Sequence, residues 1–158
     1  MKIEQRLQEL GYELPPFSEP KGNYCVTVRS GNLIFTAGHV PTDKNNELIK
    51  GKIGNDLKIE DGYEAAHRAA LGLLTTLKAE LGDLDKIKRI VKITGFVNCT
   101  DDFTAQPAVI NGASDTLCNV LGDKGKHARS AVGSNALPLN IAVEVEAIVE
   151  VESASSAL

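Results

Sequence analysis

The chain of 158 residues is long enough to bury the hydrophobic core of one domain without disulfides or structural metals. Its net charge of −4 and its 4% share of aromatic residues argue against a nucleic-acid partner, because a phosphate backbone is bound by basic surfaces. No apolar run is long enough to span a bilayer and the first residues lack a secretory pattern, so we expect a cytoplasmic protein without a membrane partner.

Residue types that could carry metal or covalent chemistry are few and scattered. Cys25, Cys99 and Cys118 lie far apart and are odd in number, which predicts buried thiols in a reducing compartment rather than disulfides. The histidines show no ligand spacing, so we expect no metal site and expect each histidine to be structural or on the surface. The sequence also lacks the common motifs for phosphate loops, dinucleotide binding, zinc proteases and nucleophile elbows.

The N-terminal segment is predicted to precede a single larger domain. Residues 3–10 carry apolar side chains at helical spacing among charged ones, which is typical of a short amphipathic helix. We therefore divide the domain into an N-terminal helix and linker (1–20), a core (21–152) and a flexible tail of small residues (153–158).

The first half of the core combines a β-hairpin pattern with a long loop. Residues 24–28 and 33–36 are rich in β-branched and aromatic residues and flank a Ser-Gly-Asn turn, which predicts a hairpin. The polar stretch 38–56 is interrupted by glycine, proline and asparagine and predicts a long loop, with one short strand near 47–49.

Two long helices and one strand follow. Apolar residues recur every three or four positions over residues 63–81, and Gly82 stands where a helix would end. Residues 87–97 are β-branched and predict a strand, and residues 108–121 repeat the helical spacing after a proline.

The last two predicted strands carry the charges of greatest interest. Strands are expected over 128–135 and 141–151, joined by a short connection that would fold them against each other and bring Arg129 near Glu144. Residues 143–146 alternate valine and glutamate, so one side of that strand is apolar and the other acidic. A guanidinium held on a strand suits a small carboxylate, because its planar donors match both oxygens.

The order of these elements predicts an α+β fold with a mixed β-sheet and the two long helices packed on one sheet face. The helix-covered face can take the valines of the last strand. The opposite face then carries Glu144 and Glu146 and must meet water or another subunit.

Four short segments carry the most specific signal in the chain. They are residues 31–41, residues 90–97 with 102–103, residues 128–130, and residues 143–146. Together and in this order they resemble the Rid family, also called the YjgF or endoribonuclease L-PSP-like family. The resemblance implies a chorismate-mutase-like fold and a homotrimer whose ligand clefts lie between subunits.

The resemblance also implies a chemistry that needs no cofactor. It is the hydrolysis of reactive enamines and imines such as 2-aminoacrylate, released by pyridoxal-phosphate enzymes, to a 2-oxo acid and ammonia. Arg129 matches the family's carboxylate-binding arginine, Glu144 its glutamate that positions the water or the nitrogen, and Tyr24 a cleft tyrosine. Asn111 matches a cleft asparagine if the extra residues of this chain lie between Phe103 and Asn111. These roles suit the substrate, because an imino acid needs a permanent cation and its hydrolysis needs a proton relay.

Two positions depart from the family pattern. Ala131 stands where the best-studied deaminases have cysteine, and Ala37 where many members have serine. Backbone groups at Ala131 and Ala37 could still contact a ligand, and we also expect a ligand contact at Gly38, in the turn after the second strand. The changes alter the shape of the pocket more than its charge, so the sequence does not identify the substrate. The chain resembles a divergent subgroup of the family.

Other interpretations stay open from the sequence. Arg129 could form only an ion pair with Glu144 or Glu146, either across the strands or between subunits. The protein could be a non-catalytic trimer that binds a small carboxylate metabolite and regulates a partner. The ribonuclease activity of the older family name ranks third, because the acidic chain offers no basic cluster interleaved with aromatic residues.

Overall fold

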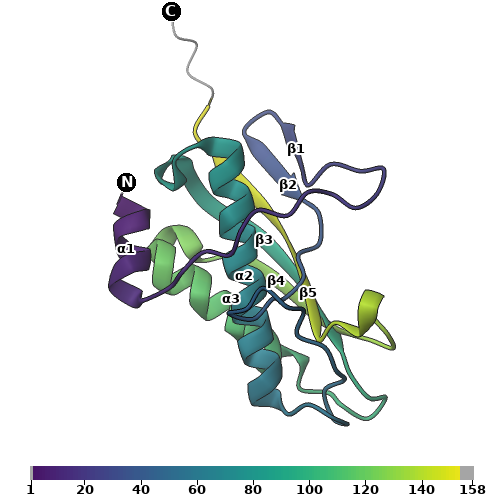
Figure 1. Ribbon diagram of the computed structural model, residues 1–158. Coiled ribbons are helices and arrows are strands. Elements are labelled where there is room, and N and C mark those ends of the chain that lie inside the picture. The colour runs from purple at the N-terminus through teal and green to yellow at the C-terminus, as the bar shows by residue number, and fades with distance from the viewer. Residues whose placement is uncertain (1, 154–158) are drawn as a thin grey trace, which may run out of the picture.

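A computed structural model describes residues 2–153 of the chain (Figure 1), so the predicted flexible tail lies outside the described residues except for residue 153. The helices and strands are α1 (Lys2–Leu10), β1 (Thr27–Ser30), β2 (Leu33–Thr36), α2 (Ile59–Leu81), β3 (Ile87–Asn98), α3 (Gln106–Leu121), β4 (Ala128–Ser134) and β5 (Val143–Val151), with short 3-10 turns η1 (Leu84–Lys86), η2 (Gly122–Gly125) and η3 (Pro138–Asn140). The predicted α+β class is confirmed. Among the described residues, no helix is long and apolar enough to cross a membrane.

The strands form one mixed sheet in the order β1-β2-β5-β3-β4. Among the strands of the described residues, only β3 and β4 pair in parallel, because the chain leaves β3 through α3 and returns alongside it. β5 then pairs antiparallel with the other side of β3. The predicted hairpin of the last two strands is therefore wrong: β3 lies between β4 and β5, and a crossover helix overrides the usual pairing of consecutive strands.

Helices α2 and α3 cover one face of the sheet, as predicted (Figure 1). Every second residue of β5 from Val143 to Val151 is buried against this layer. The two helices approach closely at Gly112, where an added β-carbon would overlap the carbonyl oxygen of Tyr63. The Tyr63 hydroxyl also donates a 2.6 Å hydrogen bond to Asp115 on α3. This contact fixes α3 against α2.

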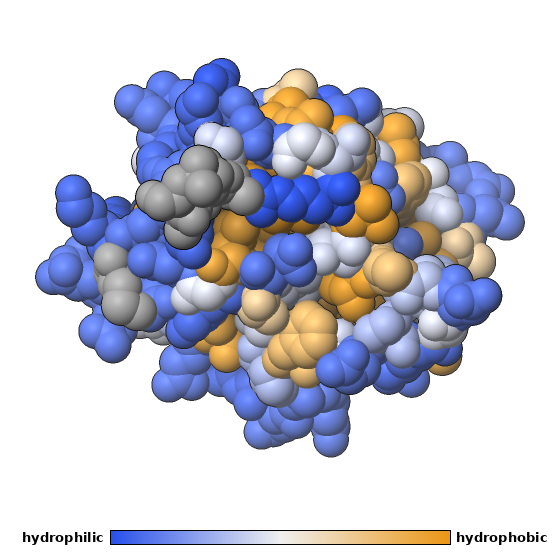
Figure 2. Space-filling view, turned by 90° about the horizontal axis from the view of Figure 1, so that it is seen from above, coloured by the Kyte–Doolittle hydropathy of each residue, from blue (hydrophilic) through white to orange (hydrophobic). Residues whose placement is uncertain are grey.

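The other face of the sheet is open in the single chain and exposes apolar side chains. Val28 and Phe35, which pair across β1 and β2, are 56% and 41% exposed, and Val132 on β4 is 43% exposed. Val132 pairs with Phe96, and Phe96 pairs with Glu144, so that carboxylate lies on the same face. Figure 2, which looks down on the molecule, shows apolar surface interrupting the hydrophilic surface. An exposed face of this kind favours contact with another protein surface.

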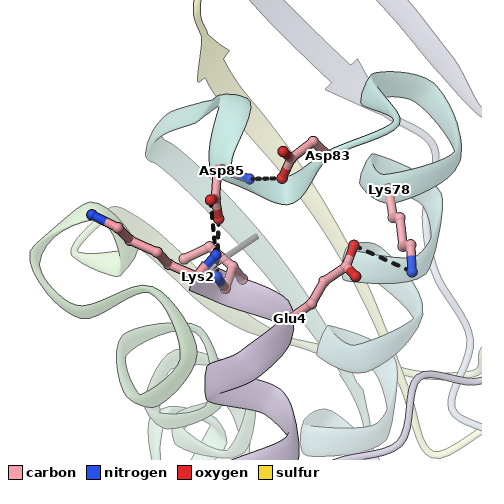
Figure 3. A network of polar contacts seen from close by, with 6 residues as sticks. Lys2, Glu4, Lys78, Asp83 and Asp85 are labelled. Carbon is pink, nitrogen blue, oxygen red and sulfur yellow. Dashed lines mark hydrogen bonds and ion pairs between the residues drawn. The ribbon is translucent and has the colours of Figure 1, made fainter.

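Helix α1 is attached to the rest of the molecule at its N-terminus (Figure 3). The Asp85 carboxylate accepts hydrogen bonds from the backbone N–H groups of Lys2 and Ile3, at 2.8 and 2.9 Å, and so caps the first turn. Glu4 forms a 3.3 Å ion pair with Lys78 of α2. Because Leu7 is also buried in the main core, α1 packs as part of that core.

Three smaller predictions differ from the structure. β1 begins at Thr27, so Tyr24 precedes the strand; this edge strand pairs only with the short β2 and extends no further than its partner. The segment near residues 47–49 forms isolated bridges, such as that of Leu48 with Thr42, rather than a strand. Cys99 is buried but Cys25 is exposed, because the segment before β1 lies outside the core.

Candidate functional site

The predicted site residues fall into two groups on different parts of the chain. The first group surrounds Arg129 near the start of β4. Its Nη1 donates hydrogen bonds to Asn111 Oδ1 at 2.8 Å and to Ser114 Oγ at 3.1 Å, both on α3. The structure therefore brings Arg129 and Asn111 together. Ala131 follows Arg129 by two positions on the same strand and so shares its sheet face.

The hydrogen bonds of Arg129 leave one edge of its guanidinium available. Nη1 carries two hydrogens, and Asn111 and Ser114 accept both. Nε and Nη2 form no hydrogen bond with the residues that the structure describes. This is the edge whose parallel N–H groups match the two oxygens of a carboxylate. The first group is thus an oriented cation suited to one carboxylate.

The second group joins Glu144 of β5 to the turn that follows β2. A β-carbon on Gly38 would lie 2.7 Å from Glu144 Cδ and 2.9 Å from its Oε2, so only glycine leaves this carboxylate its place. Burial raises the pKa of the Glu144 carboxyl above its ordinary value, and the nearby charge of Glu146 raises it further. A carboxyl whose pKa is raised in this way is a stronger base than an ordinary glutamate and can also return a proton as an acid.

His39 anchors the turn that carries Gly38. Its backbone exchanges hydrogen bonds with Val145, at 2.8 and 3.1 Å, directly beside Glu144. Its ring Nδ1 lies 2.8 Å from the carbonyl of Ala37, so Nδ1 donates, and Nε2 accepts from the Thr76 hydroxyl at 2.7 Å. Burial lowers the pKa of His39, although the bond to Ala37 opposes this effect. These ring contacts confirm the predicted structural role of His39. Its burial favours the neutral form of the ring.

The sheet register places the two groups on opposite faces. Arg129 pairs with Ile93, which is fully buried under the helices, whereas Glu144 pairs with Phe96, three residues further along β3. Side chains three apart on a regular strand point to opposite sides. Among the described residues Arg129 forms no ion pair with Glu144 or Glu146. The suggested ion pair across neighbouring strands of one chain is therefore wrong, because the strands are not neighbours.

Tyr24 forms no hydrogen bond with either group among the residues that the structure describes. Its side chain is 54% exposed, and its hydroxyl oxygen accepts a 3.4 Å hydrogen bond from the backbone N–H of Lys21. Its ring also lies against Gly22. These contacts hold the tyrosine on the surface before β1.

Two polar residues beside Arg129 were missed by the sequence reasoning. Ser114 follows Asn111 by one helical turn, so both face Arg129 from α3. His127 precedes Arg129 by two positions, and its Nε2 lies 2.9 Å from Ser114 Oγ. The His-Ala-Arg run at the start of β4 and the Asn-x-x-Ser run on α3 could have indicated His127 and Ser114.

The fold and these two groups define an α+β protein with a helix layer on one sheet face and an arginine that α3 orients at the sheet edge. The sequence matches the family described as "YjgF/chorismate mutase-like, putative endoribonuclease" over residues 4–151. The chain belongs to this family.

Relatives and solved structures agree with this assignment. The chain is 40% identical to Protein TCP17 of Trypanosoma cruzi over 153 residues, 96% of each chain. It is 27% identical over 139 residues to a 2-iminobutanoate/2-iminopropanoate deaminase of Dermatophagoides farinae, covering 87% of this chain and 93% of the relative. The protein Atu1372 of Agrobacterium tumefaciens, of unknown function, superposes with a TM-score of 0.88 at 42% identity, covering 96% and 93% of the two chains. A "putative endoribonuclease" of Shewanella oneidensis MR-1 superposes with a TM-score of 0.90 at 32% identity, covering 94% and 99%.

Proposed function

We propose that the protein hydrolyses small reactive enamines and imines, such as 2-aminoacrylate, to 2-oxo acids and ammonia. The observation that carries the proposal is the unused Nε–Nη2 edge of Arg129, oriented by Asn111 and Ser114. A carboxylate bound bidentately there would leave the C=N group of an imino acid directed away from the guanidinium. The deaminase relative from Dermatophagoides farinae supports this choice of chemistry.

We place the complete site between subunits of a homotrimer. Arg129 and Glu144 lie on opposite faces of one sheet, which supports a site in which a ligand that touches both lies between two copies of the chain. The open sheet face exposes Val28, Phe35 and Val132 around Glu144, and burying them would stabilise an assembly. Tyr24 would then reach the cleft from the neighbouring subunit.

The reaction needs water and one proton relay. Tautomerisation first adds a proton to the methylene carbon of the enamine and removes one from its nitrogen, which gives the imine. Glu144 as carboxylate takes a proton from water while the oxygen attacks the imine carbon, and Glu144 then passes this proton to the nitrogen. Collapse of the resulting carbinolamine breaks the C–N bond and releases ammonia and the 2-oxo acid. The raised pKa of Glu144 suits both directions of proton transfer.

A coupled assay tests the proposal. A pyridoxal-phosphate serine dehydratase supplies 2-aminoacrylate, and the rate of 2-oxo acid and ammonia release is followed with and without this protein. We expect the wild-type protein to accelerate release and Glu144→Gln to lose at least about 100-fold of this activity, while its affinity for 2-oxobutyrate stays within about two-fold. Glu146→Gln, on the same exposed face, is the matched control and should lose far less activity, because Glu146 affects the reaction only through its smaller effect on the pKa of Glu144.

A second candidate is a non-catalytic trimer that binds a small carboxylate metabolite and regulates a partner. It is favoured by the combination of an intact Arg129 site with Ala131 beside it. In that case 2-oxobutyrate would bind and would require Arg129, but no amino acid supplied to the dehydratase would give faster 2-oxo acid release. Acceleration that survives Glu144→Gln would also contradict our assignment of the proton relay.

A further inference from the structure

A chain of hydrogen bonds continues behind Arg129 into the protein. Arg129 Nη1 donates to Ser114 Oγ at 3.1 Å, Ser114 Oγ lies 2.9 Å from His127 Nε2, and His127 Nδ1 contacts the carbonyl oxygen of Gly125. Ser114 and His127 are both half-buried. The three side chains come from β4, α3 and the segment just before β4, so the chain connects the helix layer to the edge strand.

With the imidazole of His127 neutral, the ends of this chain fix the position of each of its protons. The Gly125 carbonyl can only accept, so His127 Nδ1 carries the hydrogen and Nε2 of the neutral ring accepts. The Ser114 hydroxyl must then donate to Nε2, which leaves its oxygen lone pairs to accept from Arg129. Asn111 Oδ1 takes the second hydrogen of Nη1. Each group thus fixes the orientation of the next one.

We infer that Ser114 and His127 are positioning residues that hold the Arg129 guanidinium in the orientation in which its Nε–Nη2 edge binds the substrate carboxylate. The inference rests on the proposed function of this site. Arginine has many rotamers, and a guanidinium that is already oriented loses less freedom when it binds a ligand. β4 is an edge strand with one neighbour, so this orientation depends on contacts from α3 and from His127.

The test compares Ser114→Ala, His127→Phe and the double variant. For each we would measure the Kd of 2-oxobutyrate by calorimetry and the KM and kcat of the coupled deaminase assay. We expect each single change to raise Kd and KM about five- to ten-fold with kcat within about two-fold, because only the binding of the carboxylate is affected. The double variant should be no weaker than Ser114→Ala alone, because His127 acts through Ser114.

Two controls separate positioning from a general structural effect. Ser114→Thr keeps the hydroxyl and should restore the Kd to within about two-fold of wild type. His67→Phe removes a similar histidine-hydroxyl contact, in which His67 Nδ1 lies 2.6 Å from Thr116 Oγ1 on α3, and should leave Kd unchanged. Thermal unfolding would confirm that each variant is folded.

Several results would overturn the inference. They are an unchanged Kd in Ser114→Ala, an equal further loss from His127→Phe in the Ser114→Ala background, or a weakening by His67→Phe as large as that by His127→Phe. Failure of the proposed function is distinguishable, because a wild-type protein without turnover would still show the dependence of 2-oxobutyrate binding on Ser114 and His127.

Discussion

Replacing Gly38 with alanine should displace the Glu144 carboxylate while leaving the fold intact. Gly38 does not have the left-handed backbone conformation that favours glycine, so alanine is compatible with its backbone. The added β-carbon would lie 2.7 Å from Glu144 Cδ and 2.9 Å from Cγ. Carbon atoms prefer a separation of roughly 3.5–4.0 Å, so the glutamate side chain must move by about 1 Å.

This displacement should affect turnover more than stability. The end of a flexible, half-exposed side chain can move at little cost, so we expect the free energy of unfolding to change by less than about 1 kcal/mol. A misplacement of about 1 Å at a reacting group can reduce a rate by about 100-fold, and we expect kcat of Gly38→Ala to fall by about 10- to 100-fold. Binding of 2-oxobutyrate, which relies on Arg129, should change little.

The assay is the coupled deaminase reaction with a matched glycine variant. Gly72→Ala is the control, because the nearest atom to its added β-carbon, apart from the helix itself, is His39 Cδ2 at 3.8 Å. It should keep wild-type activity. The double variant Gly38→Ala/Glu144→Gln should be no slower than Glu144→Gln alone. Full activity in Gly38→Ala, or an equal loss from Gly38→Ala in the Glu144→Gln background, would refute the idea that Gly38 acts by leaving room for Glu144.

Three further predictions concern stability. Burial raises the pKa of Glu144, so the folded chain binds the proton of this carboxyl more tightly than the unfolded chain does. The stability of the fold therefore falls as the pH rises from the ordinary glutamate pKa of 4.5. In urea unfolding, Glu144→Gln should be more stable than wild type at pH 7, with a smaller difference at pH 4. Burial lowers the pKa of His39, so the contribution of its neutral ring to folding stability is complete above pH 6.5 and is lost as the pH falls below that value. His39→Gln, which keeps a donor and an acceptor, should therefore reduce the fall in melting temperature between pH 7.5 and pH 5.5. An unchanged fall would contradict this prediction. Gly112→Ala should cost about 1–3 kcal/mol in urea unfolding because α2 and α3 must separate, and a stability equal to wild type would show that the contact with Tyr63 is not tight.

The local patterns of the chain predicted most of its elements because these patterns report directly on burial. The helical spacing of apolar residues predicted residues 63–81, and α2 covers Ile59–Leu81. The valine-glutamate alternation of β5 correctly predicted which side faces the helices. Boundaries were less certain at the sheet edge, where β1 is four residues long and Tyr24 lies outside it.

The candidate site was predicted in its parts but not in its arrangement. Asn111 was matched to the site from the order of motifs, and the structure places it 2.8 Å from Arg129. Ser114 and His127 were missed because they contribute only through a contact between α3 and the edge strand. Such a contact depends on how the helix layer is placed over the sheet, which no local pattern encodes.

The amino-acid sequence by itself determined the α+β class, the apolar and acidic sides of β5, and the identity of the cation and the carboxyl that we assign to the site. Only the tertiary structure decided which strands are neighbours. The connection through α3 makes β4 a parallel partner of β3, and this pairing separates Arg129 from Glu144. Strand order depends on how crossover connections and helices pack over the whole sheet, whereas the face on which a side chain lies depends only on its position along its own strand.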